Sequence, residues 1–407
     1  MSPDDLAAWL RLLATPGVGN ETARRLLAAF GLPGNIFAQK PAAWAPYVSP
    51  AQARALAAVP EGFEAELATT EEWLGARLSG SAQRAVVTLG DPAYPRSLLA
   101  TADPPVLLYL HGQVTRFAAE NAMADGAGAL GWRLAMVGSR NPSPQGAENA
   151  RRFAAAFARA GVTVVSGMAL GIDGASHEGA LEGAAARGEG GPLATIAVIG
   201  TGIDRVYPAR HRELAHRIAE QGLIISEYAL GTPPLAPHFP KRNRLISGLC
   251  QGTLVVEAAL ASGSLITARQ AAEQGRDVFA VPGSIHLAQS RGCHALIREG
   301  AQLVETADDV LQHLPHRQNP APSTATHSVA VRGGFQGSKA ENQAQKQPTE
   351  PENALLRALG GDPQSLEALA ARTGLSTDRL QAQLLELELA GEVGRLPGGR
   401  YQRIGAA

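Results

Sequence analysis

A short basic segment, HFPKRNRLI beginning at His238, contains the residues of this sequence that are most suited to binding chemistry. Three cations and an amide follow an aromatic residue there, and no acidic residue interrupts them. Cationic side chains pair with phosphates and an aromatic ring stacks on a nucleobase, so the combination is typical of a site that follows a nucleic-acid backbone. The residues concerned are Phe239, Lys241, Arg242, Asn243 and Arg244.

The orientation of the aromatic ring depends on Pro240, because proline biases the residue before it toward an extended backbone. We therefore expect Phe239 to stand clear of the fold, with Lys241 and Arg244 on either side of it. A buried and purely structural Phe239 is the alternative interpretation, as is a solvated charged surface for the cations.

Three loops that contain glycine could hold the phosphates that such a site needs. The first, MVGSRNPSPQG, follows a strand-like run and leads into a helix with Ser143 as its N-cap and Pro144 in its first turn. Backbone amides and a guanidinium in this loop can bind an anion, although a glycine required only for a tight turn explains the pattern as well. The residues that we assign to the site are Gly138, Ser139 and Arg140.

The other two loops, SGMALGIDGASHEGAL and EAALASGSLITARQ, also place small residues where a helix begins. Helix capping alone would explain their serines, and His177 is either a packed residue of a helix face or a functional one. The segment DRVYPARHR adds a further group of cations. From these three segments the candidate residues are Ser166, Gly167, Arg205, Ser264 and Arg269.

The loops lie in a segment, residues 80–311, where short β-branched runs alternate with alanine-rich helical stretches. This alternation predicts an α/β fold of the Rossmann-like type, with a doubly wound and mostly parallel sheet. The carboxyl ends of parallel strands share one crevice with the helix N-termini, so we expect the three loops to converge at that edge.

The composition changes on both sides of this segment. Residues 1–79 are rich in alanine and leucine at helical spacing, which predicts a small all-helical domain. Residues 312–350 are poor in large apolar residues and rich in Pro, Gly and Gln, as is typical of a disordered linker. In residues 351–407, three short helices precede two strands around a Pro-Gly-Gly turn, which predicts a winged helix.

The overall composition excludes several classes of protein. A chain of 407 residues with 45% hydrophobic residues and a net charge of −1 is an ordinary globular protein, so any basic site must be local. Two cysteines without metal-ligand spacing, and no GxGxxG or GxxxxGK[ST] motif, argue against a zinc, NAD or ATP site, and we expect no cofactor. No long apolar run or signal-peptide pattern is present, so we expect a cytoplasmic protein without membrane insertion.

Several segments, in this order and at these intervals, closely resemble the DNA-processing protein A family (DprA, also called Smf). They are VGSRNPSPQG, SGMALGIDGASHEGAL, AVIGTGIDRVYPARHRELAHRIAEQGLIISEY, HFPKRNRLISGL and VVEAALASGSLITARQAAEQGRDVFAVPGS. The resemblance implies a non-enzymatic protein that binds single-stranded DNA, forms homodimers and helps to load the RecA recombinase during natural transformation. It also implies that Arg140, Lys241, Arg242 and Arg244 contact the DNA.

The flanking parts carry weaker resemblances. LLATPGVGNETARRLLAAFG is similar to a helix-hairpin-helix element of a SAM-like domain, with alanine-rich packing as the alternative. The predicted recognition helix of the winged helix, STDRLQAQLLELELAG, has more acids than cations, which fits a protein partner better than a DNA groove. Residues 116–132 form a longer connection than the family has, and we expect a surface insertion there.

An enzyme is the alternative function. GTLVVEAALASGS is similar to the GGxGTxxE segment of lysine-decarboxylase-like nucleotide phosphoribohydrolases, in which Glu257 would be a catalytic carboxylate. Against this interpretation, Cys250 and Gln251 occupy the positions of the glycine pair, and the basic segment would have no role.

Overall fold

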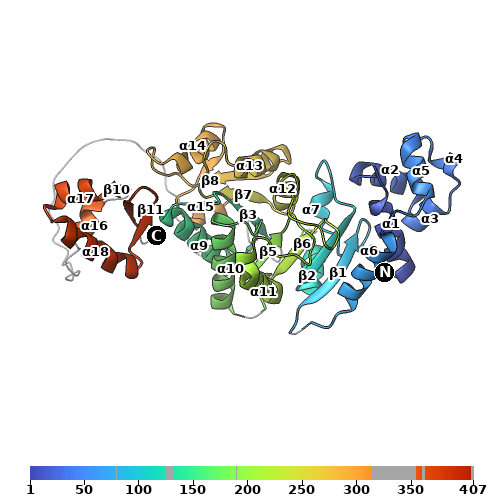
Figure 1. Ribbon diagram of the computed structural model, residues 1–407, viewed down its shortest axis with the longest axis horizontal. Helices are drawn as coiled ribbons and strands as arrows, with labels where there is room; N and C mark the ends of the chain where they lie inside the picture. Colours follow the sequence, from blue (N-terminus) through green and yellow to red (C-terminus); the bar gives the residue numbers. More distant parts are fainter. Residues whose placement is uncertain (79, 124–131, 189, 314–353, 360–362, 405–407) are drawn as a thin grey trace, which may run out of the picture. The chain divides into compact units, whose positions relative to one another are not determined.

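The computed structural model describes residues 1–78, 80–123, 132–188, 190–313, 354–359 and 363–404 (Figure 1). The chain divides into two compact units, residues 1–314 and 315–406. Among the described residues no helix combines the length and the apolar character needed to cross a membrane. The same residues contain no group of three or more His, Cys, Asp or Glu side chains that could hold a metal ion.

The first unit begins with short helices whose starts are marked by proline or by capping residues. Ser2 accepts a hydrogen bond from the N–H of Asp5 and so caps α1. Gly17 has a φ of 79° in the turn before α2, a conformation that glycine adopts without strain. The helices are α1 (Pro3–Ala14), α2 (Asn20–Phe30), α3 (Pro33–Phe37), α4 (Pro41–Trp44), α5 (Pro50–Ala57) and α6 (Phe63–Gly75). The resemblance of α1 and α2 to a helix-hairpin-helix stays a prediction.

A mostly parallel sheet follows, in the strand order β1-β2-β6-β5-β4-β3-β7-β8-β9. The pairs β1/β2 and β2/β6 are antiparallel and the others are parallel, so the predicted fold class is confirmed. The strands are β1 (Gln83–Thr88), β2 (Leu107–Gly112), β3 (Arg133–Val137), β4 (Thr163–Ser166), β5 (Thr195–Val198), β6 (Leu223–Ser226), β7 (Gly252–Val255), β8 (Asp277–Ala280) and β9 (Gln302–Leu303).

Helices cover both faces of this sheet because successive side chains of a strand point to opposite sides. On β3, Leu134 and Met136 pack with α9 and α10, whereas Ala135 and Val137 belong to the cluster that contains α12 and α13. The helices of the segment are α7 (Arg96–Leu99), α8 (Val114–Met123), α9 (Pro144–Arg159), α10 (Ile172–Arg187), α11 (Arg212–Gln221), α12 (His238–Gly248), α13 (Ser264–Glu273), α14 (Arg291–Arg298) and α15 (Ala307–Leu311), with short 3-10 turns η1 (Ala209–His211) and η2 (Ala288–Ser290).

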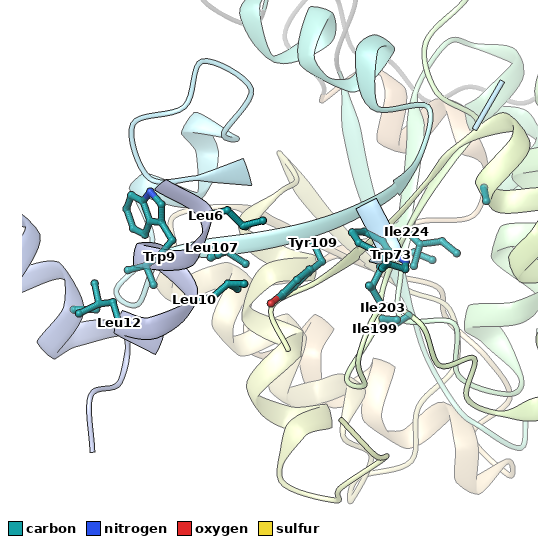
Figure 2. Packing of buried hydrophobic residues seen from close by; sticks show 14 of the residues in the cluster. Leu6, Trp9, Leu10, Leu12, Trp73, Leu107, Tyr109, Ile199, Ile203 and Ile224 are labelled. Atoms are coloured by element: carbon teal, nitrogen blue, oxygen red, sulfur yellow. The ribbon is translucent and has the colours of Figure 1, made fainter. Parts of the chain in front are cut away.

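The N-terminal helices and the sheet share one hydrophobic core (Figure 2). Leu6 and Leu10 of α1 belong to the same buried cluster as Leu107 and Tyr109 of β2. The ring of Trp73 in α6 meets the ring of Tyr109 edge-on, with centroids 6.1 Å apart. The predicted boundary between residues 79 and 80 therefore crosses a continuous core, and the independence of the two parts stays a prediction.

The expected surface insertion at 116–132 is wrong for its first half. Residues up to Met123 form α8, in which Phe117 is completely buried in the same cluster as residues of α12 and α13. Asn121 accepts a hydrogen bond of 2.7 Å from Arg133, which starts β3. This part of the connection is thus a core element; residues 124–131 lie outside the described residues.

The second unit has the three helices and the hairpin that the sequence predicts for a winged helix. Leu369, Leu380 and Leu384 form its buried core with Tyr401 of the hairpin. Its elements are α16 (Ala354–Leu359), β10 (Gln364–Ser365), α17 (Leu366–Thr373), α18 (Thr377–Leu389), β11 (Val393–Leu396) and β12 (Arg400–Arg403). The predicted linker falls almost entirely outside the described residues.

Candidate nucleic-acid interface

A cleft of about 480 Å³ lies where β3 and β7 end. From β3 the chain adds β4, β5 and β6 on one side and β7 and β8 on the other, so the strand order reverses here. Open α/β sheets bind ligands at such a point, because the loops diverge on either side and leave a crevice. The candidate residues that line the cleft are Gly138, Ser139, Arg140, Phe239, Arg242, Asn243 and Ser264.

Backbone hydrogen bonds hold the loop that carries Arg140. The N–H of Ser139 donates to the carbonyl of Glu257 at 2.6 Å, and the carbonyl of Ser139 accepts from the N–H of Ile172 at 3.1 Å. The N–H of Ser139 is therefore already hydrogen-bonded, so the prediction that this amide binds a phosphate is wrong. Arg140 is exposed, and no ion-pair partner faces it in the described part of the chain, so its charge is available to a ligand.

Glu257 stabilises the start of α9 and is not one of the residues that line the cleft. Its buried carboxylate accepts a 2.8 Å hydrogen bond from the N–H of Ser143, which also caps the helix through its hydroxyl, as predicted. Burial raises the pKa of Glu257, and the hydrogen bonds from Ser143 oppose that change. A Cβ on Gly146 would come within 2.4 Å of this carboxylate, so the close approach requires glycine there. The carboxylate of the hydrolase alternative thus has a structural role.

The basic segment is helical, which overturns the prediction of an extended Phe239. α12 begins at His238, so Phe239 and Pro240 lie in its first turn. Proline is tolerated there because the N–H groups of a first turn have no partner within the helix. With 3.6 residues per turn, Arg242 faces the sheet and Lys241 faces solvent, although the two are neighbours in the sequence.

Arg242 is buried beneath the cleft, where it joins the ends of two strands. Its Nη1 donates to the carbonyl of Gly167 at 2.8 Å and to the carbonyl of Val198 at the end of β5. Burial lowers the pKa of Arg242 to about 10, and the charge of Asp173 opposes that change. Burial likewise raises the pKa of Asp173. Arg242 therefore positions the loops of the cleft and brings less charge to its surface than the sequence suggested.

Arg244 does not reach the cleft, contrary to the prediction that it tracks phosphate. Its side chain is only 10% exposed and pairs with Glu227 at 2.5 Å and with Asp103 at 3.3 Å. Asp103 also binds Arg24 of α2 at 2.8 Å, so a chain of charges links the N-terminal helices to α12. No acidic residue interrupts the basic segment in the sequence, but acidic partners from distant segments reach Arg244 in the fold.

Phe239 lies in the wall of the cleft with part of its ring accessible. The Arg140 guanidinium is 5.7 Å from the centroid of this ring, within reach of a cation–π contact. The Tyr207 ring lies on Phe239 at a centroid distance of 5.7 Å. An accessible ring beside an unpaired cation can stack a base and bind its phosphate together.

The remaining candidates are not part of the cleft wall. Lys241 is exposed and lies 6.0 Å from the centroid of Tyr228, and Arg205 is exposed on the loop after β5. Ser166 is fully buried and donates to the carbonyl of Met136 at 2.6 Å. The carbonyl of Gly167 accepts a hydrogen bond from the buried Arg242. Arg269 lines a separate cleft of about 320 Å³ between α13 and α14.

Sequence reasoning missed two residues that shape the site. Asp173 sits in the apolar run GIDGAS, where an unexplained acid was the available signal for a buried partner of Arg242. Tyr207 is the single aromatic residue among the cations of DRVYPARHR, and that composition could have identified it. His177 is buried, with its Nδ1 2.7 Å from the hydroxyl of Thr195, which settles it as a packed residue of α10.

Comparisons with known proteins agree along the chain. The family described as DNA recombination-mediator protein A matches residues 85–315, and the DprA winged helix domain matches residues 339–399. The chain is 40% identical over 312 residues to Protein Smf of Escherichia coli, covering 76% of this chain and 75% of that protein. It is 32% identical over 428 residues to Protein Smf of Synechocystis, covering 99% of this chain and 100% of the relative.

A solved structure agrees with the sequence comparisons. The X-ray structure of DNA processing protein A from Streptococcus pneumoniae superposes with a TM-score of 0.60 at 34% identity. The superposition covers 76% of this chain and 99% of that one.

Proposed function

The chain belongs to the DNA recombination-mediator protein A family (DprA/Smf), and from this membership we propose that it binds single-stranded DNA in the cleft and helps to load the RecA recombinase. One observation carries the DNA-binding part: Arg140, without an acidic partner in the described residues, stands over the accessible ring of Phe239 at the switch point of the sheet. A ring can stack only on a base whose faces are open, so the arrangement favours single strands over duplex.

The decisive experiment is a salt titration of binding to single-stranded and double-stranded oligonucleotides. Each cation that neutralises a phosphate on a single strand contributes about 0.7 to the slope of log affinity against log salt concentration. Arg140→Ala should lower that slope by about 0.7 and weaken binding to oligo-dT and mixed sequences alike.

Arg159→Ala is the matched control. Arg159 is also an exposed arginine, but it ends α9, about 24 Å along the helix from the cleft edge if each residue rises 1.5 Å. An Arg140→Ala protein with the slope of the wild type, or wild-type binding no tighter to single strands than to duplex, contradicts the proposal.

The recombinase and dimer proposals rest on different support. A recombination mediator, as the family is described, acts together with a recombinase, so the protein should speed RecA assembly on single-stranded DNA. A large apolar side chain, Ile285 at 72% exposure, lies in the segment 265–300 that we propose as the homodimer surface. Light scattering that reports only monomer at micromolar concentration would exclude the dimer.

We propose no enzymatic activity and a cytoplasmic location. Both cysteines, Cys250 and Cys293, are free and buried, which is compatible with a reducing compartment. The hydrolase alternative depends on Glu257, whose carboxylate is engaged by Ser143. Turnover of nucleoside monophosphates by the purified protein would restore that alternative.

A further inference from the structure

Tyr207 presents an aromatic ring to solvent just outside the cleft. The side chain is 50% exposed and is the only aromatic residue among the strongly exposed large apolar side chains of the described residues. Its hydroxyl makes no hydrogen bond within that part of the chain. The ring packs against Phe239 on one side, and its exposed part is available to a ligand beside the cleft.

The backbone that leads into Tyr207 is held by hydrogen bonds and packing. The N–H of Arg205 donates to the carbonyl of Gly202 at 2.9 Å, and the hydroxyl of Thr201 donates to the carbonyl of Arg205 at 2.9 Å. Val206 packs against the hydrophobic core. The ring therefore projects from a rigid loop, and little conformational entropy is lost when a ligand stacks on it.

Two arginines lie close to Tyr207 in the sequence, one on each side. Arg205 and Arg210 are exposed on the same loop, and no acidic residue lies between them in the sequence. The neighbouring Asp204 uses its carboxylate to accept a 2.8 Å hydrogen bond from the N–H of Gly231. An exposed ring flanked in the sequence by cations that have no ion pair within the described part of the chain is suited to a base that carries its own phosphate.

The geometry of the two rings decides how bases can bind. The centroids of Tyr207 and Phe239 are 5.7 Å apart and the rings are tilted by 37°. Stacked bases are spaced about 3.4 Å apart, so a base inserted between two rings needs a gap of about 7 Å. No base fits between these two rings, so each ring must stack a base on the face that points away from the other ring.

We propose that Tyr207 is a second base-stacking residue, which holds the nucleotide that leaves the cleft while Phe239 holds its neighbour inside. Arg205 and Arg210 bind the phosphates of this outer part of the strand. The inference rests on the proposed function, because it extends the same DNA track from the cleft along the loop after β5.

The test uses the full-length protein, fluorescence anisotropy with oligo-dT, and the variants Tyr207→Ala and Tyr207→Phe. Tyr207→Ala should weaken binding about five- to tenfold, the lower part of the range for loss of one base–aromatic stack, because half of the ring is already packed. Tyr207→Phe should bind like the wild type. Neither variant should change the salt slope, because no charge is removed.

A second measurement identifies the base. Single abasic sites are moved along the oligonucleotide: in the wild type, two neighbouring abasic positions should weaken binding, and in Tyr207→Ala one of them should lose its effect. The control is Tyr47→Ala, which removes a tyrosine from another aromatic pair, with Phe30 at 5.3 Å, neither of which lines the cleft. It should bind as the wild type does.

The outcomes separate this inference from the proposed function. If the wild type binds and Arg140→Ala lowers the salt slope, but Tyr207→Ala binds normally, the inference alone fails. It also fails if Tyr207→Phe loses as much affinity as Tyr207→Ala, since the hydroxyl and not the stacking face would then be responsible. A wild-type protein that does not bind single strands removes both.

Discussion

Replacing Arg244 by alanine should destabilise the fold, although its sequence context suggests a DNA contact. The variant leaves the Glu227 side chain, 4% exposed, without the cation that lies 2.5 Å away. Breaking a buried ion pair by removing one partner costs about 3–5 kcal/mol. We expect the lower end of this range, about 3 kcal/mol. Nε and Nη1 of Arg244 have no hydrogen-bond partner among the described residues, so the wild-type ion pair is itself stabilised by fewer hydrogen bonds than it could make.

Thermal and urea unfolding measure this loss. For a unit of this size, about 3 kcal/mol corresponds to a melting temperature lower by roughly 5 °C or more. The second substitution Glu227→Gln on the Arg244→Ala background should restore part of the stability, because it removes the uncompensated carboxylate. Lys241→Ala is the matched control on the same helix: it should leave stability within about 0.5 kcal/mol and lower the salt slope by about 0.7.

One result would refute this reasoning. If Arg244→Ala melts like the wild type and its salt slope falls by about 0.7, the side chain contacts phosphate and the ion pair with Glu227 contributes nothing. Unchanged stability in the Glu227→Gln double variant relative to Arg244→Ala would show that the stranded carboxylate is not the cause of the loss.

Other consequences follow from buried groups and from composition. Burial lowers the pKa of His177 to about 3, below the value near 6.5 of an unfolded histidine. Between pH 6.5 and 3 the unfolded state therefore binds one more proton than the folded state. The free energy of unfolding decreases as the pH is lowered through this range. His177→Gln should reduce the proton uptake on unfolding in that window by about one, as measured from stability against pH; an unchanged slope would exclude this origin. Gly167→Ala would place a Cβ 2.6 Å from Arg242 and 2.7 Å from Asp173, so binding of single strands should weaken, and normal affinity and melting temperature would show that the strand ends tolerate the shift. The composition of residues 313–350 predicts that limited proteolysis cuts there and releases a stable core that contains residues 80–310 and still binds single strands; protection of that stretch in mass spectrometry would contradict it.

Much of the fold could be predicted because its signals are local. The β-branched runs ending at Val137 and Val255, separated by helical stretches, indicated a parallel doubly wound sheet, and the structure confirms it. Ser143 followed by proline marked the start of α9 correctly. The shared core of the N-terminal helices and the sheet was not predictable, since Leu6 and Tyr109 meet only through long-range packing.

The candidate site was predicted in part for the same reason. Residues of the loops after β3 and β7 reached one cleft because parallel strands carry their carboxyl ends to one edge. Phe239 also lies there, but the extended backbone predicted from Pro240 was wrong, because proline fits the first turn of a helix equally well.

The sequence alone therefore determined the class of sheet, the winged helix and the loops that meet at the cleft, because these depend on periodicity, capping and turn residues that are close together in the chain. Only the tertiary structure decided what each cation does. Lys241 is exposed and Arg244 is buried because the phase of α12 against the sheet turns one outward and the other inward. The acids that neutralise the buried cation, Glu227 and Asp103, come from distant segments, and no local pattern records that pairing.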